Sequence, residues 1–515
     1  MRHKGRKRDL IKKLHKWPSL VVAFFIIIWA FSGIILNHRY LFSSVDVNRA
    51  LMPAEHHYRN WNNAAVRGSV RIDSLKFLLY GNVGAWEYDE IEESWRAMNS
   101  GFPGGADHYK INCMILSNQG DLLAGTRYGL YKYDRERDIW TVIDIPHSDK
   151  HVVDLMEMNG FIWVMTRSHL WKTDPIFVKD LAHIPIPAPE GYDNKVGLFK
   201  TLWVIHSGEI YGQAGKLFVD GVALIFVFLT LSGLVYFFFP RWMKRRKKKD
   251  LAIKRLAYWN RWSVKWHNKI GIWLVAILLI TTFTGMFLRP PLLIAIASGR
   301  VAKIPLTVLD DGNPWFDQLR RIVYDESYNV ILLATSEGIF AVDKDLKYAP
   351  KYVYPQPPAS VMGYNVFCEN TAGNILVGSF SGIFEWNPGN GQIIDMVSGL
   401  PHNNASAPGI PISDNMISGY HVDRNGLEYL FDYNKGVLIP NPDGTFPVMP
   451  EQISESRMPL WNVALEMHTA RLLKPLLGDF YILFIPLFGL TAIIILISGS
   501  ILWIRKFKRN SERKI

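Results

Sequence analysis

Four long apolar runs divide the chain, and two long segments of mixed polarity lie between them. As a helix, each run is long enough to cross a hydrocarbon core of about 30 Å. The runs cover residues 20–36, 217–239, 270–288 and 480–503. We therefore predict four membrane spans, of which the second and the fourth begin with a lead-in segment. Their predicted bounds are 17–39, 201–240, 266–290 and 463–505.

In the segments between the spans, 40–200 and 300–462, apolar and polar positions alternate around glycine-containing turns, which is typical of β-hairpins. The two segments repeat each other, since Gly120, Gly125 and Gly129 each align with a glycine 253 positions later. Turn glycines recur 44 or 45 positions apart within each segment, which suits a four-stranded propeller blade of about 40–45 residues. We predict about six blades, three from each segment, in one β-propeller. Two separate small β domains are the alternative.

The apolar runs are duplicated as well, because each contains a Ser-Gly or Thr-Gly pair and follows a histidine. The four histidine and glycine pairs are His15 and Gly33, His206 and Gly233, His267 and Gly285, and His468 and Gly499. The spacing is 18 residues in the first and third pairs, against 27 and 31 in the other two. The predicted fold class is mixed membrane α plus all-β, with a four-helix transmembrane bundle that arose by internal duplication and an external propeller-like domain.

The net charge of +12 comes from three short basic segments. Residues 1–16, 240–265 and 505–515 hold eight, eleven and six Lys or Arg, and one acidic residue each, so the rest of the chain is net negative. Short basic segments of membrane proteins stay in the cytoplasm, which argues against a nucleic-acid partner. We expect a multi-pass membrane protein with a cytoplasmic N-terminus (1–16), loop (241–265) and tail (506–515), and with both large segments outside.

The outer compartment is oxidising, and Cys113 and Cys368 are the only two cysteines. A disulfide between them is one option, but segments of this length do not need it. Two thiols alone cannot form a structural zinc site. The first apolar run lacks a small-residue cleavage site after it, so we interpret it as a retained helix and not as a cleaved signal peptide.

The histidines fall into two pairs when the spans are oriented. His15 and His267 precede outward-going spans and belong at the cytoplasmic edge, whereas His206 and His468 precede inward-going spans and belong at the external edge. Histidines at span ends can simply face lipid headgroups, but recurrence in both halves favours a shared role. Two imidazoles without a thiolate or carboxylate suit bis-histidine haem iron better than zinc, so two haems are expected.

The glycines support this interpretation by their depth in the membrane. Eighteen helical residues span about 27 Å, which puts Gly33 and Gly285 near the external histidines, and Gly233 and Gly499 near the cytoplasmic ones. A flat macrocycle there would need a missing side chain, although small residues also simply let helices touch. The longer spacings before Gly233 and Gly499 place their histidines on an amphipathic lead-in.

His38, at the outer end of the first span, complicates the external site. The duplication offers no counterpart, because Arg289 and Pro290 stand at the equivalent place. His38 could replace one external ligand or bind a haem propionate.

The membrane segments resemble the PepSY-associated transmembrane family, which includes bacterial ferric-siderophore reductases. The resemblance is carried by LHKWPSLVVAFFIIIWAFSGIILNH, IHSGEIYGQAGKLFVDGVALIFVFLTLSGLVYFF, WHNKIGIWLVAILLITTFTGMFL and MHTARLLKPLLGDF with its following span. It covers the membrane parts, roughly 150 of the 515 residues. It implies a protein of the bacterial cytoplasmic membrane with its large segments in the periplasm, b-type haems held by helix histidines, and electron transfer outward to iron in siderophores. It makes His15, His206, His267 and His468 the ligand candidates, with His38 in the family-like LNH run. The chain departs from such relatives outside the membrane, where propeller repeats replace PepSY modules and leave the substrate open.

Two hypotheses of function follow. The first is a haem-containing oxidoreductase that carries electrons across the membrane to a ferric chelate or a protein acceptor outside. No G-x-G-x-x-G follows a strand and the cytoplasmic segments are short, so the donor is a quinol or a separate protein. The second is a non-enzymatic, membrane-anchored propeller that senses or binds a partner. No residue is assigned a catalytic role, because the external histidines are scattered.

Overall fold

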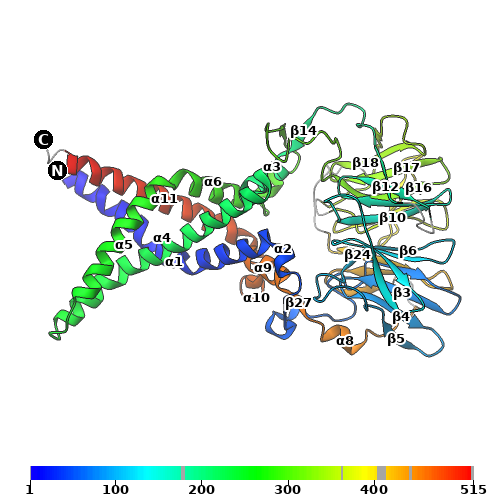
Figure 1. The fold of residues 1–515 in the computed structure, drawn as a ribbon, viewed down its shortest axis with the longest axis horizontal. Coiled ribbons are helices and arrows are strands. Elements are labelled where there is room, and N and C mark those ends of the chain that lie inside the picture. The colour runs from blue at the N-terminus through cyan, green and yellow to red at the C-terminus, as the bar shows by residue number, and fades with distance from the viewer. Residues whose placement is uncertain (1, 175–179, 361–362, 403–412, 440–443, 512–515) are drawn as a thin grey trace. The chain divides into compact units, whose positions relative to one another are not determined.

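The computed structural model describes residues 2–174, 180–360, 363–402, 413–439 and 444–511. The predicted cytoplasmic tail therefore lies in part outside the described residues. The chain divides into a helical unit and a strand unit (Figure 1). The helical unit is Met1–Phe42, Lys195–Asp310 and Leu460–Ile515, and the strand unit is Ser43–Asn194 and Asp311–Pro459.

Long helices form most of the helical unit, and short helices precede or follow them. The long helices are α1 (Arg2–Asn37), α4 (Gly212–Lys247), α5 (Lys254–Trp273), α6 (Val275–Met286) and α11 (Phe484–Ser511). The short ones are α2 (Arg39–Phe42), α3 (Leu198–Ser207), α7 (Leu292–Ile296), α9 (Leu460–His468) and α10 (Lys474–Leu477). Three 3₁₀ turns, η3 (Glu209–Tyr211), η4 (Arg471–Leu473) and η5 (Gly478–Leu483), and the strand pair β14 (Lys195–Gly197) and β15 (Arg300–Ala302) complete the described part of the unit.

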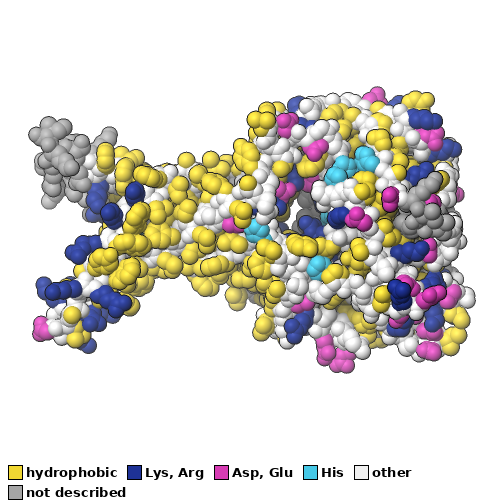
Figure 2. Space-filling view, viewed as in Figure 1, with side chains coloured by type: hydrophobic (Ala, Val, Ile, Leu, Met, Phe, Trp, Pro, Cys, Tyr) yellow, Lys and Arg dark blue, Asp and Glu magenta, His cyan; other side chains and the backbone are white. Residues whose placement is uncertain are grey.

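Three of these helical segments are long and apolar enough to cross a membrane: 10–37, 209–247 and 471–507. Their apolar windows are at most 22% buried within the protein. So much exposed apolar surface is stable against lipid and not against water. Figure 2 shows hydrophobic side chains along the helices, with Lys and Arg gathered at one end of them. The chain is therefore a membrane protein, and lipid contacts these helices.

The third predicted span differs from a single straight helix over 266–290. The helix α5 begins earlier, at Lys254, and α6 continues from it after a bend of 67° at Leu274. The pair is either one broken span or a re-entrant loop, so the third predicted span stays a prediction. The histidines of the two lead-in segments lie on α3 and α9, which 3₁₀ turns separate from the long helices α4 and α11.

The strand unit contains six antiparallel sheets of three or four strands in its described residues, each in simple chain order. The first three sheets are β2 (Gly68–Arg71), β3 (Lys76–Gly81), β4 (Gly84–Asp89), β5 (Ser94–Ala97); β6 (Ile111–Leu116), β7 (Leu122–Thr126), β8 (Leu130–Asp134), β9 (Ile139–Ile143); and β10 (Val152–Met158), β11 (Phe161–Thr166), β12 (Leu170–Thr173), β13 (Ala182–Ile184). The others are β16 (Leu319–Asp325), β17 (Val330–Thr335), β18 (Gly338–Asp343), β19 (Lys351–Tyr352); β20 (Val366–Glu369), β21 (Ile375–Ser379), β22 (Gly382–Trp386), β23 (Ile393–Asp395); and β24 (Ile417–Val422), β25 (Glu428–Asp432), β26 (Gly436–Leu438).

The sheets follow one another around a common centre. The first strand of each sheet lies against the first strand of the next, and β24 lies against β2. A short pair, β1 (Asp46–Val47) with β27 (Met458–Pro459), joins the two ends of the unit, which also holds η1 (Arg49–Leu51), η2 (Ala54–His56) and α8 (Glu451–Ser454). The propeller-like architecture predicted from the repeats is confirmed.

The repeated turn glycines and tryptophans have structural roles. Gly129 directly precedes the third strand of its sheet, and Gly338 and Gly382 begin the third strands of theirs, with φ of 157°, 127° and 118°, which side chains rarely adopt. The tryptophans of the repeats are buried in the sheet cores. They are Trp86, Trp140, Trp163, Trp171 and Trp386, none more than 7% exposed.

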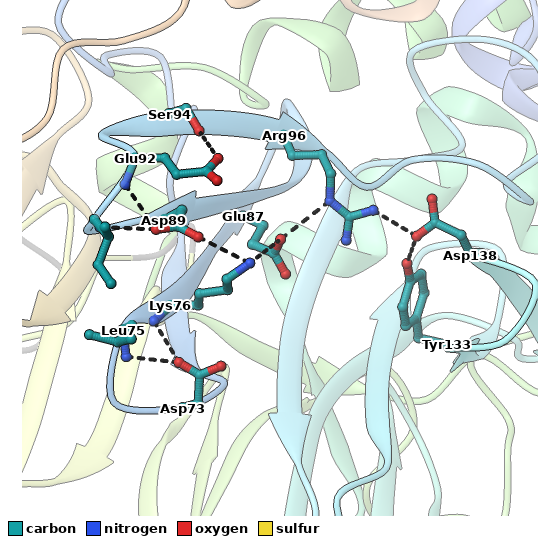
Figure 3. A network of polar contacts seen from close by, with 11 residues as sticks. Asp73, Leu75, Lys76, Glu87, Asp89, Glu92, Ser94, Arg96, Tyr133 and Asp138 are labelled. Atoms are coloured by element: carbon teal, nitrogen blue, oxygen red, sulfur yellow. Dashed lines mark hydrogen bonds and ion pairs between the residues drawn. The ribbon is translucent and has the colours of Figure 1, made fainter.

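Charged side chains cover the outer strands of the first sheets. Lys76 reaches Asp89 at 3.1 Å, and Arg96 of the edge strand β5 bridges Glu87 at 3.2 Å and Asp138 at 2.8 Å (Figure 3). Such exposed pairs contribute about 0–1 kcal/mol each. Their larger effect is on solubility, because charges on an edge strand oppose pairing with another chain.

The strand unit is expected to lose stability in mild acid through His421. This side chain is 2% exposed, packs against Phe77 with ring centroids 4.6 Å apart, and lies 2.8 Å from the Ser69 hydroxyl. Burial, with a smaller contribution from Arg71 and against the effect of Asp423, lowers the pKa of His421 to about 4. The unfolded chain takes up this proton below about pH 6.5, so stability is lost as the pH falls from about 6.5 to 4, by roughly 2–3 kcal/mol.

Urea unfolding at pH 7.0 and pH 4.5 measures this loss. The variant His421→Asn has no group that titrates in this range, and we expect it to lose roughly 2–3 kcal/mol less than the wild type on acidification. Equal losses in both proteins would show that His421 is not responsible.

Candidate functional site

The first histidine pair lies between α1 and α5. His15 of α1 and His267 of α5 face each other with ring centroids 6.2 Å apart and planes inclined by 76°. Both side chains are half-buried. The sequence predicted this pairing from the orientation of the spans, and the structure brings the two residues together.

The second histidine pair lies between the two short helices that precede the long ones. His206 lies in the last turn of α3 and His468 ends α9, and their ring centroids are 6.1 Å apart with planes inclined by 58°. The two pairs therefore have nearly the same separation, although the sequence spacing to the glycines differs. The longer spacing is possible because His206 and His468 lie on α3 and α9, which are separate from the long helices α4 and α11 that carry the glycines Gly233 and Gly499.

Each of the four glycines contacts a histidine of the other chain half. A Cβ on Gly285 would lie 2.6 Å from His206 Cε1, and a Cβ on Gly499 would lie 2.8 Å from His15 Cε1. Those separations are far below van der Waals contact, so a side chain at either position would displace the imidazole. The contacts at Gly33, with His468 at 3.3 Å, and at Gly233, with His267 at 3.6 Å, are looser. Each glycine thus lies beside a histidine of the other pair, and an imidazole edge occupies the space that the missing side chain leaves.

Every imidazole is held through Nδ1. The acceptors are backbone carbonyl oxygens for three of them: Ile495 O for His15 at 3.0 Å, Thr281 O for His206 at 2.9 Å, and Leu229 O for His267 at 3.1 Å. Each of these carbonyls lies four residues before the glycine that the same histidine contacts. A carbonyl only accepts, so Nδ1 carries the proton and Nε2 keeps its lone pair.

The hydroxyls before the glycines add to this docking. Ser32 Oγ donates to the Ile28 carbonyl and therefore accepts from His468 Nδ1 at 3.0 Å, and Ser232 Oγ lies 2.9 Å from His267 Nδ1. Sequence reasoning noted these Ser-Gly and Thr-Gly pairs but gave a role to the glycine alone. A serine or threonine stands before each of the four glycines, and this pattern could have predicted hydroxyl groups that hydrogen-bond the imidazoles.

The arrangement leaves two unprotonated nitrogens for one ligand at each pair. Within the described part of the chain, Nε2 of these four histidines has no hydrogen-bond partner, and no group of three His, Cys, Asp or Glu side chains could hold a metal ion. Cys113 and Cys368 lie in the strand unit and are not bonded to each other. A metal at either pair would thus have two imidazole ligands from the protein.

His38 has a different partner. Its Nε2 lies 2.5 Å from Asp220 Oδ2, and Asn37 donates to the other oxygen of that carboxylate at 3.1 Å. The structure therefore joins His38 to the start of α4 and not to the second histidine pair.

The close contact at Gly285 predicts a specific sensitivity. In Gly285→Ala the new Cβ must push His206 away from its Thr281 acceptor, and overpacking of this kind costs about 1–3 kcal/mol. Gly221→Ala is the matched control, because nothing lies within 4 Å of a Cβ at that position of α4. We expect thermal unfolding in detergent to occur at a lower temperature for Gly285→Ala only, and an unchanged midpoint would contradict the tight docking.

The chain as a whole has no strong likeness among the known proteins described next. Solved structures resemble it weakly: the extracellular domain of a protein described as a hybrid two-component system of B. thetaiotaomicron has a TM-score of 0.37 at 10% identity, over 75% of this chain and 34% of that one. A streptogramin B lyase scores 0.35 at 9% identity, over 74% and 94%. PorZ of the type-IX secretion system of Porphyromonas gingivalis scores 0.33 at 11%, over 73% and 39%. The chain thus spans about a third of the length of the first of these proteins. No curated protein sequence matches it.

The family comparison concerns the middle of the helical unit. The family described as the PepSY-associated TM region matches residues 188–325, about a quarter of the chain. The match includes α3 to α6, with one histidine of each pair, His206 and His267. The chain is therefore a membrane protein whose residues 188–325 belong to the PepSY-associated TM family.

Proposed function

We propose that the helical unit carries electrons across the bacterial cytoplasmic membrane through two b-type haems, one at each histidine pair. The observation that carries the proposal is the pair of imidazoles at each site, tethered through Nδ1 and with Nε2 open. Two neutral imidazoles without a thiolate or carboxylate are the axial ligand set of a b-type haem. When bound, each haem supplies a one-electron couple. The protein fixes the ligand geometry in advance, because the second partner of a ligating imidazole sets its tautomer and orientation.

The positions of the two pairs suit a path across the membrane. Along α1, His15 belongs to the first pair and Gly33 contacts His468 of the second. These 18 helical residues correspond to about 27 Å, nearly the thickness of the hydrocarbon core. In this proposal the first pair lies on the cytoplasmic side and the second pair on the periplasmic side, with both termini inside, and the three basic segments support that orientation.

The proposed acceptor is a ferric chelate, such as a siderophore, in the periplasm. One-electron reduction converts Fe(III) to Fe(II), which binds hard oxygen ligands less tightly, so the iron is released. The strand unit, proposed as a closed six-bladed propeller with three blades per half, lies on the same side by topology. The role is that of an oxidoreductase of the ferric-siderophore-reductase type.

Purified protein gives the direct test. We expect a reduced-minus-oxidised difference spectrum of b-type haem with two haems per chain, and reoxidation of the reduced protein by a ferric siderophore. A colourless, haem-free protein would overturn the conduit and favour a membrane-anchored propeller that only binds a partner. Haem without reoxidation by ferric chelates would overturn the proposed acceptor.

A further inference from the structure

A cavity of about 550 Å³ opens at the basic end of the helical unit, where α4, α5 and α11 meet. This volume is within the usual range for small-molecule sites. The polar part of its wall is formed by Asn260, Arg261, Lys265, Asn268 and Lys506. The histidine pairs do not line it, and the proposed function leaves it without a role.

The wall carries three cations and no carboxylate. Arg261, Lys265 and Lys506 form no ion pair with a described acidic residue. Such a wall attracts an oxygen-rich ligand and stabilises negative charge that develops on it.

Asn260 also lines the cavity, and its side-chain amide can hydrogen-bond the polar head group of a ligand there. The choice between a quinol and an anionic lipid depends on what surrounds the three cations.

The cavity also lies beside the first histidine pair. Asn260 and Val264 precede His267 by seven and three residues, so they share its face of α5 and lie about 10 Å and 5 Å away along the axis. On α11, Trp503 lies one turn beyond Gly499, which contacts His15. Both walls of the cavity are thus continuous with the helix faces that build the pair.

Aromatic rings form the remaining wall toward lipid. Trp503 and Phe507 stack with centroids 5.2 Å apart, and Tyr236 and Phe507 are 60% and 62% exposed on a membrane-spanning unit. A ligand that is dissolved in the membrane can therefore approach laterally and place a flat ring against them.

We infer that this cavity binds the head group of a membrane quinol, and that the quinol is the electron donor; this assignment rests on the proposed function. The quinol is oxidised to the quinone, two O–H bonds break, and two protons leave to cytoplasmic water. Its two electrons reduce two ferric ions outside, one at a time. Asn260 accepts a hydrogen bond from the quinol hydroxyl, while Lys265 and Arg261 stabilise the oxygen as its proton leaves.

Binding is measured on the full-length protein in detergent, by quenching of the fluorescence of a 2-alkyl-4-hydroxyquinoline N-oxide, a quinol analogue. We expect saturable binding to the wild type and at least tenfold weaker binding to Lys265→Met and Asn260→Leu. Lys254→Met is the matched control, because it removes the same charge from α5 outside the cavity and should bind as the wild type does. Size-exclusion profiles and circular dichroism identify any variant that has failed to fold.

The readout does not depend on haem, so the two proposals can fail separately. A wild type that contains haem but does not bind the analogue, or cavity variants that bind it unchanged, would overturn the quinol site and leave the conduit with another donor. Displacement of the analogue by phosphatidylglycerol or cardiolipin vesicles, but not by a short-chain quinol, would overturn it in favour of an anionic lipid. Analogue binding to a haem-free protein would support the site and overturn the conduit.

Discussion

His267→Ala is expected to reduce the haem content from two per chain to about one. The substitution removes one of the two imidazoles at the first pair and leaves His15 alone against Gly499. The second pair uses neither residue, so its haem should remain. The pyridine haemochrome assay on purified protein measures the stoichiometry, and His468→Ala should give the same loss at the other pair.

Two controls decide which residues are ligands. His38→Ala should retain both haems, because its Nε2 is engaged by Asp220 and does not reach the second pair. The double variant His267→Ala/His468→Ala should contain none. A full complement in His468→Ala together with loss in His38→Ala would show that His38 is the external ligand and that the pairing with His206 is wrong.

Asp154→Ala is expected to destabilise the strand unit by about 3–5 kcal/mol. Asp154 and Arg321 are each 7% exposed and form an ion pair at 3.1 Å near the centre of the propeller. The guanidinium also donates to backbone carbonyls of neighbouring first strands and of the residues just before β20, so it ties four sheets together. Those acceptors are Asn112, Val153, Tyr364 and Asn365. Without its carboxylate the buried cation lacks compensation.

Urea unfolding of the full chain, followed by tryptophan fluorescence, measures this loss. The control Arg96→Met breaks the exposed pairs of Figure 3 and should change stability by no more than about 1 kcal/mol. The double variant Asp154→Leu/Arg321→Met should lose less than Asp154→Ala, because it removes both charges. Equal losses of stability in Asp154→Ala and Arg96→Met would show that the buried pair stabilises the strand unit no more than an exposed pair does.

The histidine geometry could be predicted because it depends on helix periodicity and topology. An 18-residue repeat and a fixed rise per residue place Gly33 at the level of His468 before any contact is known. The partner of His38 was not predictable, since Asp220 lies 182 residues away and nothing in the repeat marks it. The same holds for Arg321 and Asp154, whose contact spans 167 residues. The bend at Leu274 also has no proline to announce it.

The four glycine contacts indicate how a chain with two similar halves arose. His15 and His206 dock on glycines of the second half, and His267 and His468 dock on glycines of the first. No half holds a complete pair or even one docked imidazole. This reciprocity is that of an isologous dimer interface. A free half would have to dimerise with its own copy before either site existed, so the sites would depend on protein concentration. After fusion of two copies, both sites form when the single chain folds.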